Sequence, residues 1–189
     1  EMAEDITLNG NGIRNIQDPT IFGDPDHIES PYYFTGSSDF GGVHTNSSVP
    51  NKVLYLTING DTHYGIEVEP FSEDAIVSRE IAGNIWFNWN AYYLAEYDGF
   101  FIAAGKMLQT ANDLYPSDSS IQQTVYDAWR SVGVDIFEPY LELNELTITE
   151  EIDGVINPGE DVYIEISLEN ITSNFAENVI GELSCPELP

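Results

Sequence analysis

Basic residues are scarce in this sequence of 189 residues. Only five Lys and Arg stand against 33 Asp and Glu, which gives a formal net charge of −28. A surface of this charge repels nucleic acid and anionic lipid, so we expect neither nucleic acid nor a membrane as a partner. The acidity is compatible with a solvated surface, with salt tolerance, or with binding of a cation such as calcium.

Cysteines and long apolar runs are also missing. Cys185 is the single cysteine, which excludes an internal disulfide and a cysteine-type zinc site. No run of residues approaches the roughly 20 apolar residues that a membrane-spanning helix needs. The acidic opening, Glu1 to Asp5, has the character of an internal segment and not of a signal peptide, so we expect more chain before it.

Apolar residues are present in sufficient number for a folded core, since they make up 42% of the chain. Residues 1–43 are rich in Gly, Pro, Asn and Asp, and this composition predicts a long structured loop region. Helical spacing begins near Pro50, and the alternation typical of strands replaces it after Asp135. We therefore predict a mainly α domain, a helix bundle with a long N-terminal loop region, in residues 1–137 and a small all-β module in residues 138–189.

Four helices are predicted in the first domain, at residues 50–59, from about residue 72, at 100–114 and at 119–132. An apolar stripe predicts the buried face of the second helix, and its members are Val77, Ile81, Ile85, Trp89 and Tyr92. Strands are predicted at 142–149, 162–168 and 179–183. Three strands make a poor sandwich by themselves, so the module is either the start of a longer β-sandwich or one that another chain completes.

His44 has the surroundings of a catalytic residue, unlike His27 and His63. It closely follows Gly41 and Gly42, which permit a tight backbone path, and Asp39 lies five residues back across that bend. A carboxylate beside an imidazole fixes its tautomer and favours the cationic form, which is a strong hydrogen-bond donor. Such a donor stabilises the oxyanion of a tetrahedral transition state.

The segment from Asp39 to Ser47 resembles the one that carries the active-site histidine of thermolysin-like zinc metalloendopeptidases. Other segments resemble this family in the same order, and they are residues 12–19 (GIRNIQDP), 23–27 (GDPDH), 51–53 (NKV), 60–65 (GDTHYG) and 127–134 (DAWRSVGV). The first domain is thus similar to the carboxy-terminal helical domain of these peptidases. The turn at residues 153–160 resembles the start of immunoglobulin-like or CARDB-type modules of secreted bacterial enzymes.

The resemblance implies a role for each matching residue. His44 corresponds to the histidine that donates to the tetrahedral intermediate, Asp39 to the carboxylate that orients it, and Arg14 to the arginine that grips the substrate carbonyl beside the scissile bond. Such a grip suits arginine, whose fork of donors keeps its charge. Ile13, Ile6 and Met2 correspond to positions that line the apolar specificity pocket of the family. Glu1 and Glu4 correspond to acidic residues that bind calcium.

The zinc-binding motif of the family is absent from this sequence. The resemblance implies two histidines of an H-E-x-x-H helix and a downstream glutamate as zinc ligands, with the motif's own glutamate as the base. No histidine here is followed by glutamate or by a second histidine four residues on. We therefore expect the zinc ligands and the base to lie upstream of Glu1, in an N-terminal catalytic half, and we expect this polypeptide alone to be inactive.

Three functions remain open at this stage. The chain is part of a secreted metalloendopeptidase that acts on peptides or proteins, or it is a non-catalytic peptide-binding or assembly module. In a third arrangement, the catalytic half is a separate chain that associates through the open cleft face. The presence of Arg14, Asp39 and His44 together favours the enzyme, because a purely structural descendant has no physical need for all three.

Overall fold

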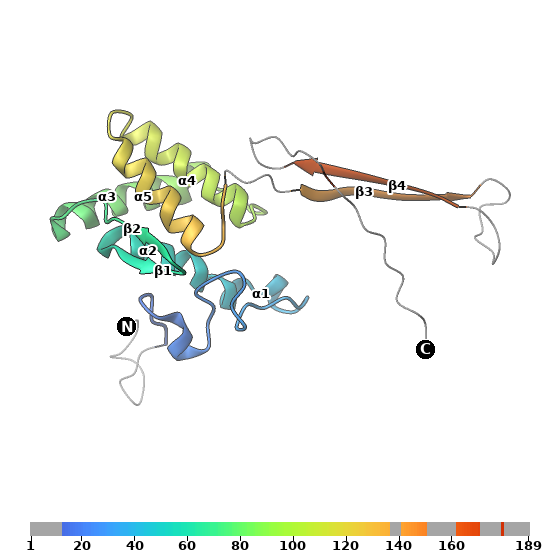
Figure 1. The fold of residues 1–189 in the computed structure, drawn as a ribbon, viewed down its shortest axis with the longest axis horizontal. Helices are drawn as coiled ribbons and strands as arrows, with labels where there is room; N and C mark the ends of the chain where they lie inside the picture. The colour runs from blue at the N-terminus through green and yellow to red at the C-terminus, as the bar shows by residue number, and fades with distance from the viewer. Residues whose placement is uncertain (1–12, 137–140, 151–161, 171–178, 180–189) are drawn as a thin grey trace. The chain divides into compact units, whose positions relative to one another are not determined.

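The computed structural model describes residues 13–136, 141–150, 162–170 and 179. Its internal contacts divide the chain into two compact units, residues 1–136 and 137–189, which are considered separately. Figure 1 shows the first unit as a packed group of helices with a small hairpin and the second with a pair of long strands. The prediction of a mainly α fold followed by a small β segment is confirmed.

The helices of the first unit lie close to the predicted ranges. The helix predicted at 100–114 has those bounds, and the one predicted at 119–132 ends one residue earlier. In chain order, the helical elements are η2 (Pro19–Phe22), α1 (Asp39–Asn46), α2 (Ser48–Asn59), α3 (Ala75–Asn88), η3 (Trp89–Tyr93), α4 (Phe100–Leu114) and α5 (Ser119–Ser131). Among them, no helix has the length and apolarity needed to cross a membrane.

Aspartates cap the N-termini of three of these helices. The Asp74 carboxylate accepts hydrogen bonds from the backbone N–H groups of Ile76 and Val77, which explains why α3 begins three residues after the predicted start at Ser72. Asp118 caps α5 and Asp18 caps η2 in the same way. Part of the acidic character of the chain is thus used to satisfy helix ends.

The core of the first unit forms where α2, α4 and α5 meet. Trp129 is fully buried there, and its indole Nε1 donates to the Met107 sulfur at 3.3 Å. The Trp89 indole donates to the Ala103 carbonyl oxygen at 2.8 Å. The other fully buried large side chains include Val49, Val53, Leu56, Ile85, Val125, Val132 and Val134.

The predicted apolar stripe of α3 is only partly correct. Ile85 and Trp89 are buried, but Val77 is 42% exposed and Tyr92 is 72% exposed. A spacing of four residues exceeds the helical period of about 3.6, so each step rotates the side chain by about 40° and the stripe drifts off the core. The true buried face has spacings of four, three and four residues, and it consists of Ser78, Ala82, Ile85 and Trp89. The π-helical turn η3 then changes the phase again before Tyr92.

A two-stranded hairpin within the segment 60–68 was not predicted. Strands β1 (Asp61–His63) and β2 (Ile66–Val68) pair antiparallel across a two-residue turn in which Tyr64 and Gly65 have φ values of 46° and 80°. These left-handed values suit a tight hairpin turn. Three-residue strands give too short a pattern for recognition from alternation.

The second unit contains one antiparallel hairpin of strands β3 (Leu141–Glu150) and β4 (Val162–Asn170). Leu146 pairs with Ile166 and Ile148 pairs with Ile164, while a register irregularity lies between Leu143 and Glu145. Both strands contain the ranges predicted for them. The third predicted strand falls at 179–183, where only Val179 is described and is not in a strand. The resemblance to immunoglobulin-like or CARDB-type modules stays a prediction.

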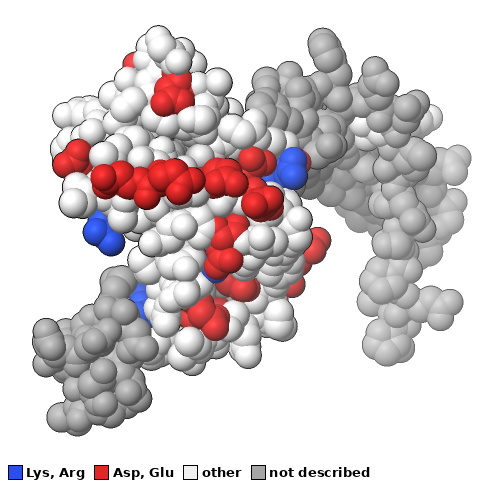
Figure 2. Space-filling model, turned by 60° about the vertical axis from the view of Figure 1, so that its left-hand side comes forward, with Lys and Arg blue, Asp and Glu red and all other residues white. Residues whose placement is uncertain are grey.

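Acidic side chains form a row across the face of the first unit drawn in Figure 2, and few basic side chains are visible on that face. This arrangement agrees with the net charge of −28. Charges spread in this way over a solvated surface act mainly through solubility and long-range repulsion.

Gly133 provides a test of how tightly the loop after η2 packs against the end of α5. Its φ is 90°, and a Cβ atom there would lie 2.6 Å from Ile28 Cγ1 and 2.7 Å from His27 Cε1. We expect Gly133→Ala to lower the free energy of unfolding by about 2 kcal/mol or more, through backbone strain and overpacking. Urea unfolding followed by tryptophan fluorescence would measure this.

Gly105→Ala is the matched control for that substitution. Gly105 lies within α4, and a Cβ atom there would meet nothing within 4 Å. It should raise the free energy of unfolding by about 0.5–1 kcal/mol, because alanine loses less backbone entropy in a helix. Equal effects of the two substitutions would contradict the packing described here.

Candidate functional site

The candidate site is built on an unusual turn at the start of α1. Four consecutive residues have positive φ values, which are 53° for Asp39, 50° for Phe40, 81° for Gly41 and 83° for Gly42. The backbone N–H groups of Gly41 and Gly42 both donate to the Ser38 carbonyl oxygen, at 3.1 and 3.2 Å. The chain thus makes a left-handed turn before it continues as a right-handed helix, and this reversal returns Asp39 toward His44.

Gly42 permits the close approach of this turn to Phe34. A Cβ atom at position 42 would lie 2.6 Å from Phe34 Cδ1, so no larger residue fits without displacement of that ring. Glycine also adopts the positive φ at low cost. The two glycines singled out in the sequence therefore have the function expected of them, which is to allow a tight backbone path.

Asp39 and His44 form a pair with two contacts. Asp39 Oδ1 lies 2.5 Å from His44 Nδ1, and Asp39 Oδ2 accepts the backbone N–H of His44 at 3.1 Å. The hydrogen bonds from the His44 side chain and backbone lower the pKa of the Asp39 carboxyl. Because an ionised carboxylate only accepts, Nδ1 carries a proton, and Nε2 becomes a second donor when the ring is cationic. The His44 side chain is 79% exposed.

Arg14 is brought to the same segment from thirty residues away. Its Nη1 donates to Ser47 Oγ at 2.9 Å and to Ser48 Oγ at 3.2 Å, and its Nη2 donates to the His44 carbonyl oxygen. These partners are neutral, so they orient the guanidinium without neutralising its charge. The structure thus unites the segments of Arg14, Asp39 and His44, three residues singled out from the sequence.

Lys52 and Asn46 are two residues of this site that sequence reasoning missed. The Lys52 ammonium donates to the Gln17 carbonyl oxygen at 2.7 Å and so fastens the Arg14 loop to α2; burial lowers its pKa. Asn46 donates to the carbonyl oxygens of Phe34 and Gly41 and accepts the backbone N–H of Phe34. Both residues are largely buried. No sequence pattern marks them, because a polar residue on a helix is usually exposed.

Comparison with known proteins agrees with this geometry. Residues 1–134 match the family described as the thermolysin metallopeptidase alpha-helical domain. The chain belongs to this family. It is 40% identical over 138 residues to a bacillolysin of Bacillus cereus and 38% identical over 137 residues to a thermolysin of Alicyclobacillus acidocaldarius subsp. acidocaldarius. A neutral protease B of Bacillus subtilis (strain 168) is 34% identical over 137 residues.

Each match covers only part of the relative. It includes 71% of this chain, but the chain spans 23–24% of the length of these relatives. The relatives are proteases, and the matching part of this chain corresponds to one domain of such a metallopeptidase. The resemblance inferred from the motifs is therefore confirmed at the level of the family.

The remaining residues predicted for the site are not all described. The Ile13 side chain, beside Arg14, is 55% exposed. The pocket residues Ile6 and Met2 and the calcium candidates Glu1 and Glu4 lie outside the described residues. Within the described ranges, no three His, Cys, Asp or Glu side chains are grouped so that they could hold a metal ion. The residues present there do not fit a zinc site.

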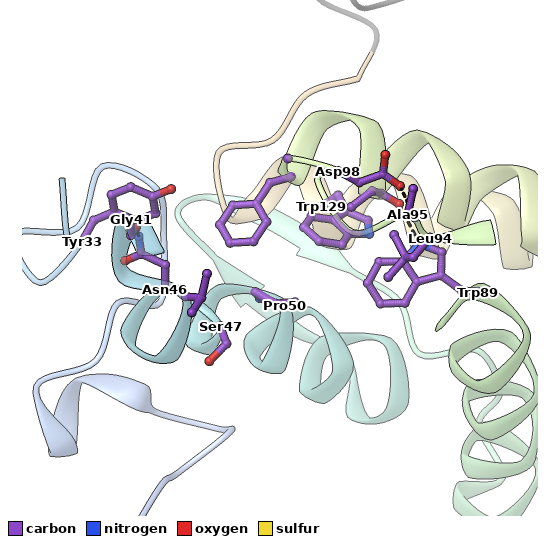
Figure 3. A pocket seen from close by; sticks show the side chains of 14 residues that line it. Tyr33, Gly41, Asn46, Ser47, Pro50, Trp89, Leu94, Ala95, Asp98 and Trp129 are labelled. Atoms are coloured by element: carbon purple, nitrogen blue, oxygen red, sulfur yellow. Dashed lines mark hydrogen bonds between the residues drawn. The ribbon is translucent and has the colours of Figure 1, made fainter. Parts of the chain in front are cut away.

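A cavity of about 380 Å³ lies behind the Asp39–His44 segment. Figure 3 shows its walls, in which Gly41, Asn46 and Ser47 face the indoles of Trp89 and Trp129. Asp98 lies at its edge, where its carboxylate accepts from the Ala95 backbone N–H at 2.7 Å and from Lys106 Nζ at 2.5 Å. His44 does not line this cavity, so the imidazole and the cavity belong to different faces of α1.

Asn46 generates a prediction about the stability of the site. Asn46→Ala removes three hydrogen bonds and leaves the N–H and carbonyl groups of the partly buried Phe34 without these partners, so it should lower the free energy of unfolding by about 1–3 kcal/mol. The amide NMR signals of Asp39 and His44 should shift as well. Asn59→Ala is the control, since exposed Asn59 makes a single bond to the Tyr55 carbonyl oxygen. Identical losses for both variants would contradict a special role for Asn46.

His27 and His63 are buried and bonded within the fold, away from the exposed setting of His44. His27 Nδ1 accepts the Glu29 backbone N–H at 3.0 Å, and its ring stacks on Tyr64. His63 Nε2 donates to the Asp26 carbonyl oxygen at 3.0 Å. Burial is the main cause that lowers the pKa of both imidazoles. Burial therefore favours the neutral form of each ring.

These lowered pKa values predict a loss of stability in mild acid. Between the unfolded pKa of about 6.5 and the lower folded values, the unfolded chain binds more protons, so the free energy of unfolding should fall as the pH falls through this window. Urea unfolding at pH 8 and pH 5 would measure the difference. A His63→Gln variant lacks one of these two imidazoles, so its free energy of unfolding should differ less between pH 8 and pH 5. If the difference were the same as in the unaltered chain, this account would be refuted.

Proposed function

We propose that this chain is the C-terminal half of a secreted zinc metalloendopeptidase and supplies its transition-state histidine and substrate-gripping arginine. The observation that carries the proposal is the Asp39–His44 pair, whose Nδ1–Oδ1 distance is 2.5 Å, with Arg14 bonded to the same segment. Membership of a family of peptidases supports it. Peptides or proteins are the proposed substrates.

His44 is proposed to act as the donor to the oxyanion. Asp39 holds the Nδ1 proton, so the ring keeps one orientation. In the cationic form of the ring, Nε2 donates to the oxygen that becomes negative when the peptide carbonyl turns tetrahedral. A donor of this kind contributes about 10²–10³ in rate, because its interaction strengthens as charge develops.

Arg14 is proposed to bind a substrate carbonyl next to the scissile bond. Its described partners are one carbonyl and two hydroxyl oxygens, so the guanidinium retains its full charge for a substrate oxygen. The bond to the His44 carbonyl ties the guanidinium to the backbone of the histidine segment. This link would keep the two substrate contacts in register, which favours a productive orientation.

The proposed partner of this chain is an N-terminal half that holds zinc and the base that activates water. The described residues offer no group of metal ligands, so this chain is not assigned the activation of water. Without that step, the clamp of His44 and Arg14 has no reaction to accelerate. The isolated chain is therefore proposed to be inactive, and the zinc-dependent step belongs to the partner half.

Kinetics of the complete enzyme, this chain together with the zinc-binding half, would test the proposal. His44→Ala should lower kcat/KM for a Phe- or Leu-containing peptide by about 10²–10³, mainly through kcat. Gln109→Ala, at an exposed position of α4, should leave kcat/KM unchanged. The purified chain alone should not cleave the peptide, with or without added zinc. Zinc-dependent cleavage by the chain alone, or full activity of His44→Ala, would refute the proposal.

A further inference from the structure

Phe40 combines two unfavourable features that the fold itself does not explain. Its backbone has a φ of 50° and a ψ of 42°, a left-handed conformation that glycine and asparagine adopt more readily than a bulky residue. Its side chain is 92% exposed, so packing within the described part of the chain provides almost no compensation. Strain of this kind at a site is a reason to look for a function of the side chain.

The position of Phe40 suggests what that function is. It directly follows Asp39, the carboxylate that holds His44, and it lies in the same left-handed turn. One further apolar side chain is exposed next to a site residue, since Ile13 beside Arg14 is 55% exposed. Apolar groups thus accompany Asp39 and Arg14.

In the proposed function, neither His44 nor Arg14 recognises a peptide side chain, whereas an exposed apolar ring could do so. Arg14 and His44 are donors, and in the proposed function they bind carbonyl oxygens, which every peptide presents alike. They therefore cannot distinguish one peptide side chain from another. An exposed aromatic ring has no group for main-chain recognition but gains free energy when it buries an apolar side chain.

We propose that Phe40 contacts an apolar side chain of the peptide held by His44 and Arg14, and that it determines the preference for bulky apolar residues at that position. The inference rests on the proposed function and adds a specificity-determining residue to it. The strain at position 40 is then the cost of presenting the ring at the rim of the site instead of folding it into the core.

Thermal stability provides the first arm of the test. Phe40→Asn places a residue that tolerates left-handed backbone at the strained position, so the Tm of the full chain should rise by about 2–4 °C. Ile76→Asn is the matched control, because Ile76 is also an exposed apolar residue, at 66%, but lies in the first turn of the regular helix α3, which Figure 1 draws well apart from α1. Its Tm should not rise. A fall of Tm in Phe40→Asn would show that the ring supports the fold, and would overturn the proposal.

Peptide binding provides the second arm. The full chain is titrated with acetyl-Gly-Leu-amide and with acetyl-Gly-Ala-amide, while the amide NMR signals of His44 and Phe40 are followed. The leucine peptide should bind about tenfold more tightly than the alanine peptide. Its larger side chain has additional apolar groups to bury against the ring, and such groups typically change affinity by about this factor. Phe40→Asn should abolish this preference but keep the response of His44, whereas Ile76→Asn should preserve both.

The outcomes separate this proposal from the one on which it rests. If His44 responds to both peptides and the leucine preference survives in Phe40→Asn, the role of Phe40 is refuted and the proposed function stands. If neither peptide shifts the His44 signals of the unaltered chain, peptide binding at this site is refuted, and the role of Phe40 with it.

Discussion

The hydrogen bond between the Asp39 carboxylate and the His44 imidazole depends on a reversal of backbone handedness within four residues. A right-handed helix through Asp39 would place residues 39 and 44 on different sides of its axis, because five residues correspond to about 1.4 turns. The left-handed turn removes this difference and lets both carboxylate oxygens reach His44, one at the ring and one at the backbone N–H. Two of the four residues in the turn are glycines, which adopt positive φ values at low energetic cost. Gly42 also provides space for the Phe34 ring.

This left-handed turn also depends on polar contacts with the segments around it. Asn46 binds the backbone of Phe34 on both its N–H and its carbonyl side, as a neighbouring strand would. Arg14 and Lys52 attach the loop of residues 14–17 to α1 and α2 through carbonyl and hydroxyl oxygens. The described part of the N-terminal loop, residues 13–38, has little regular structure of its own, so these side chains provide much of its order.

The parts of the fold that follow from local periodicity were accessible from the sequence. The helix at 100–114 has the bounds that its pattern predicted. Val77 was misassigned because a spacing of four residues drifts around a helix, and Tyr92 because the π-helical turn η3 changes the phase. The β1–β2 hairpin was too short to give a pattern. Asp39 and His44 were singled out by the two glycines and the carboxylate that precede the histidine, and the resemblance of their segment to a family then implied their roles.

Asn46 and Lys52 remained hidden for a different reason. Both are polar residues on helices, and the usual position of such a residue is the surface. Their burial depends on acceptors supplied by segments distant in sequence, such as the Gln17 carbonyl oxygen for Lys52. Only the three-dimensional arrangement of the loops reveals those acceptors. Long-range satisfaction of polar groups therefore limits what a single sequence discloses about this site.

The overall charge of the chain opposes the proposed chemistry, because a net charge of −28 disfavours another negative charge on a substrate oxygen. Distance decides which effect prevails. The Debye length is about 8 Å at physiological ionic strength, so carboxylates spread over the surface are largely screened at the site. Donors in hydrogen-bond contact are hardly screened, and in the proposed function Arg14 and His44 are such donors. The chain has only five basic residues, and two of them, Arg14 and Lys52, fasten the loop that borders His44. The proposed function would thus use a few locally placed cations to favour an oxyanion on an otherwise acidic molecule.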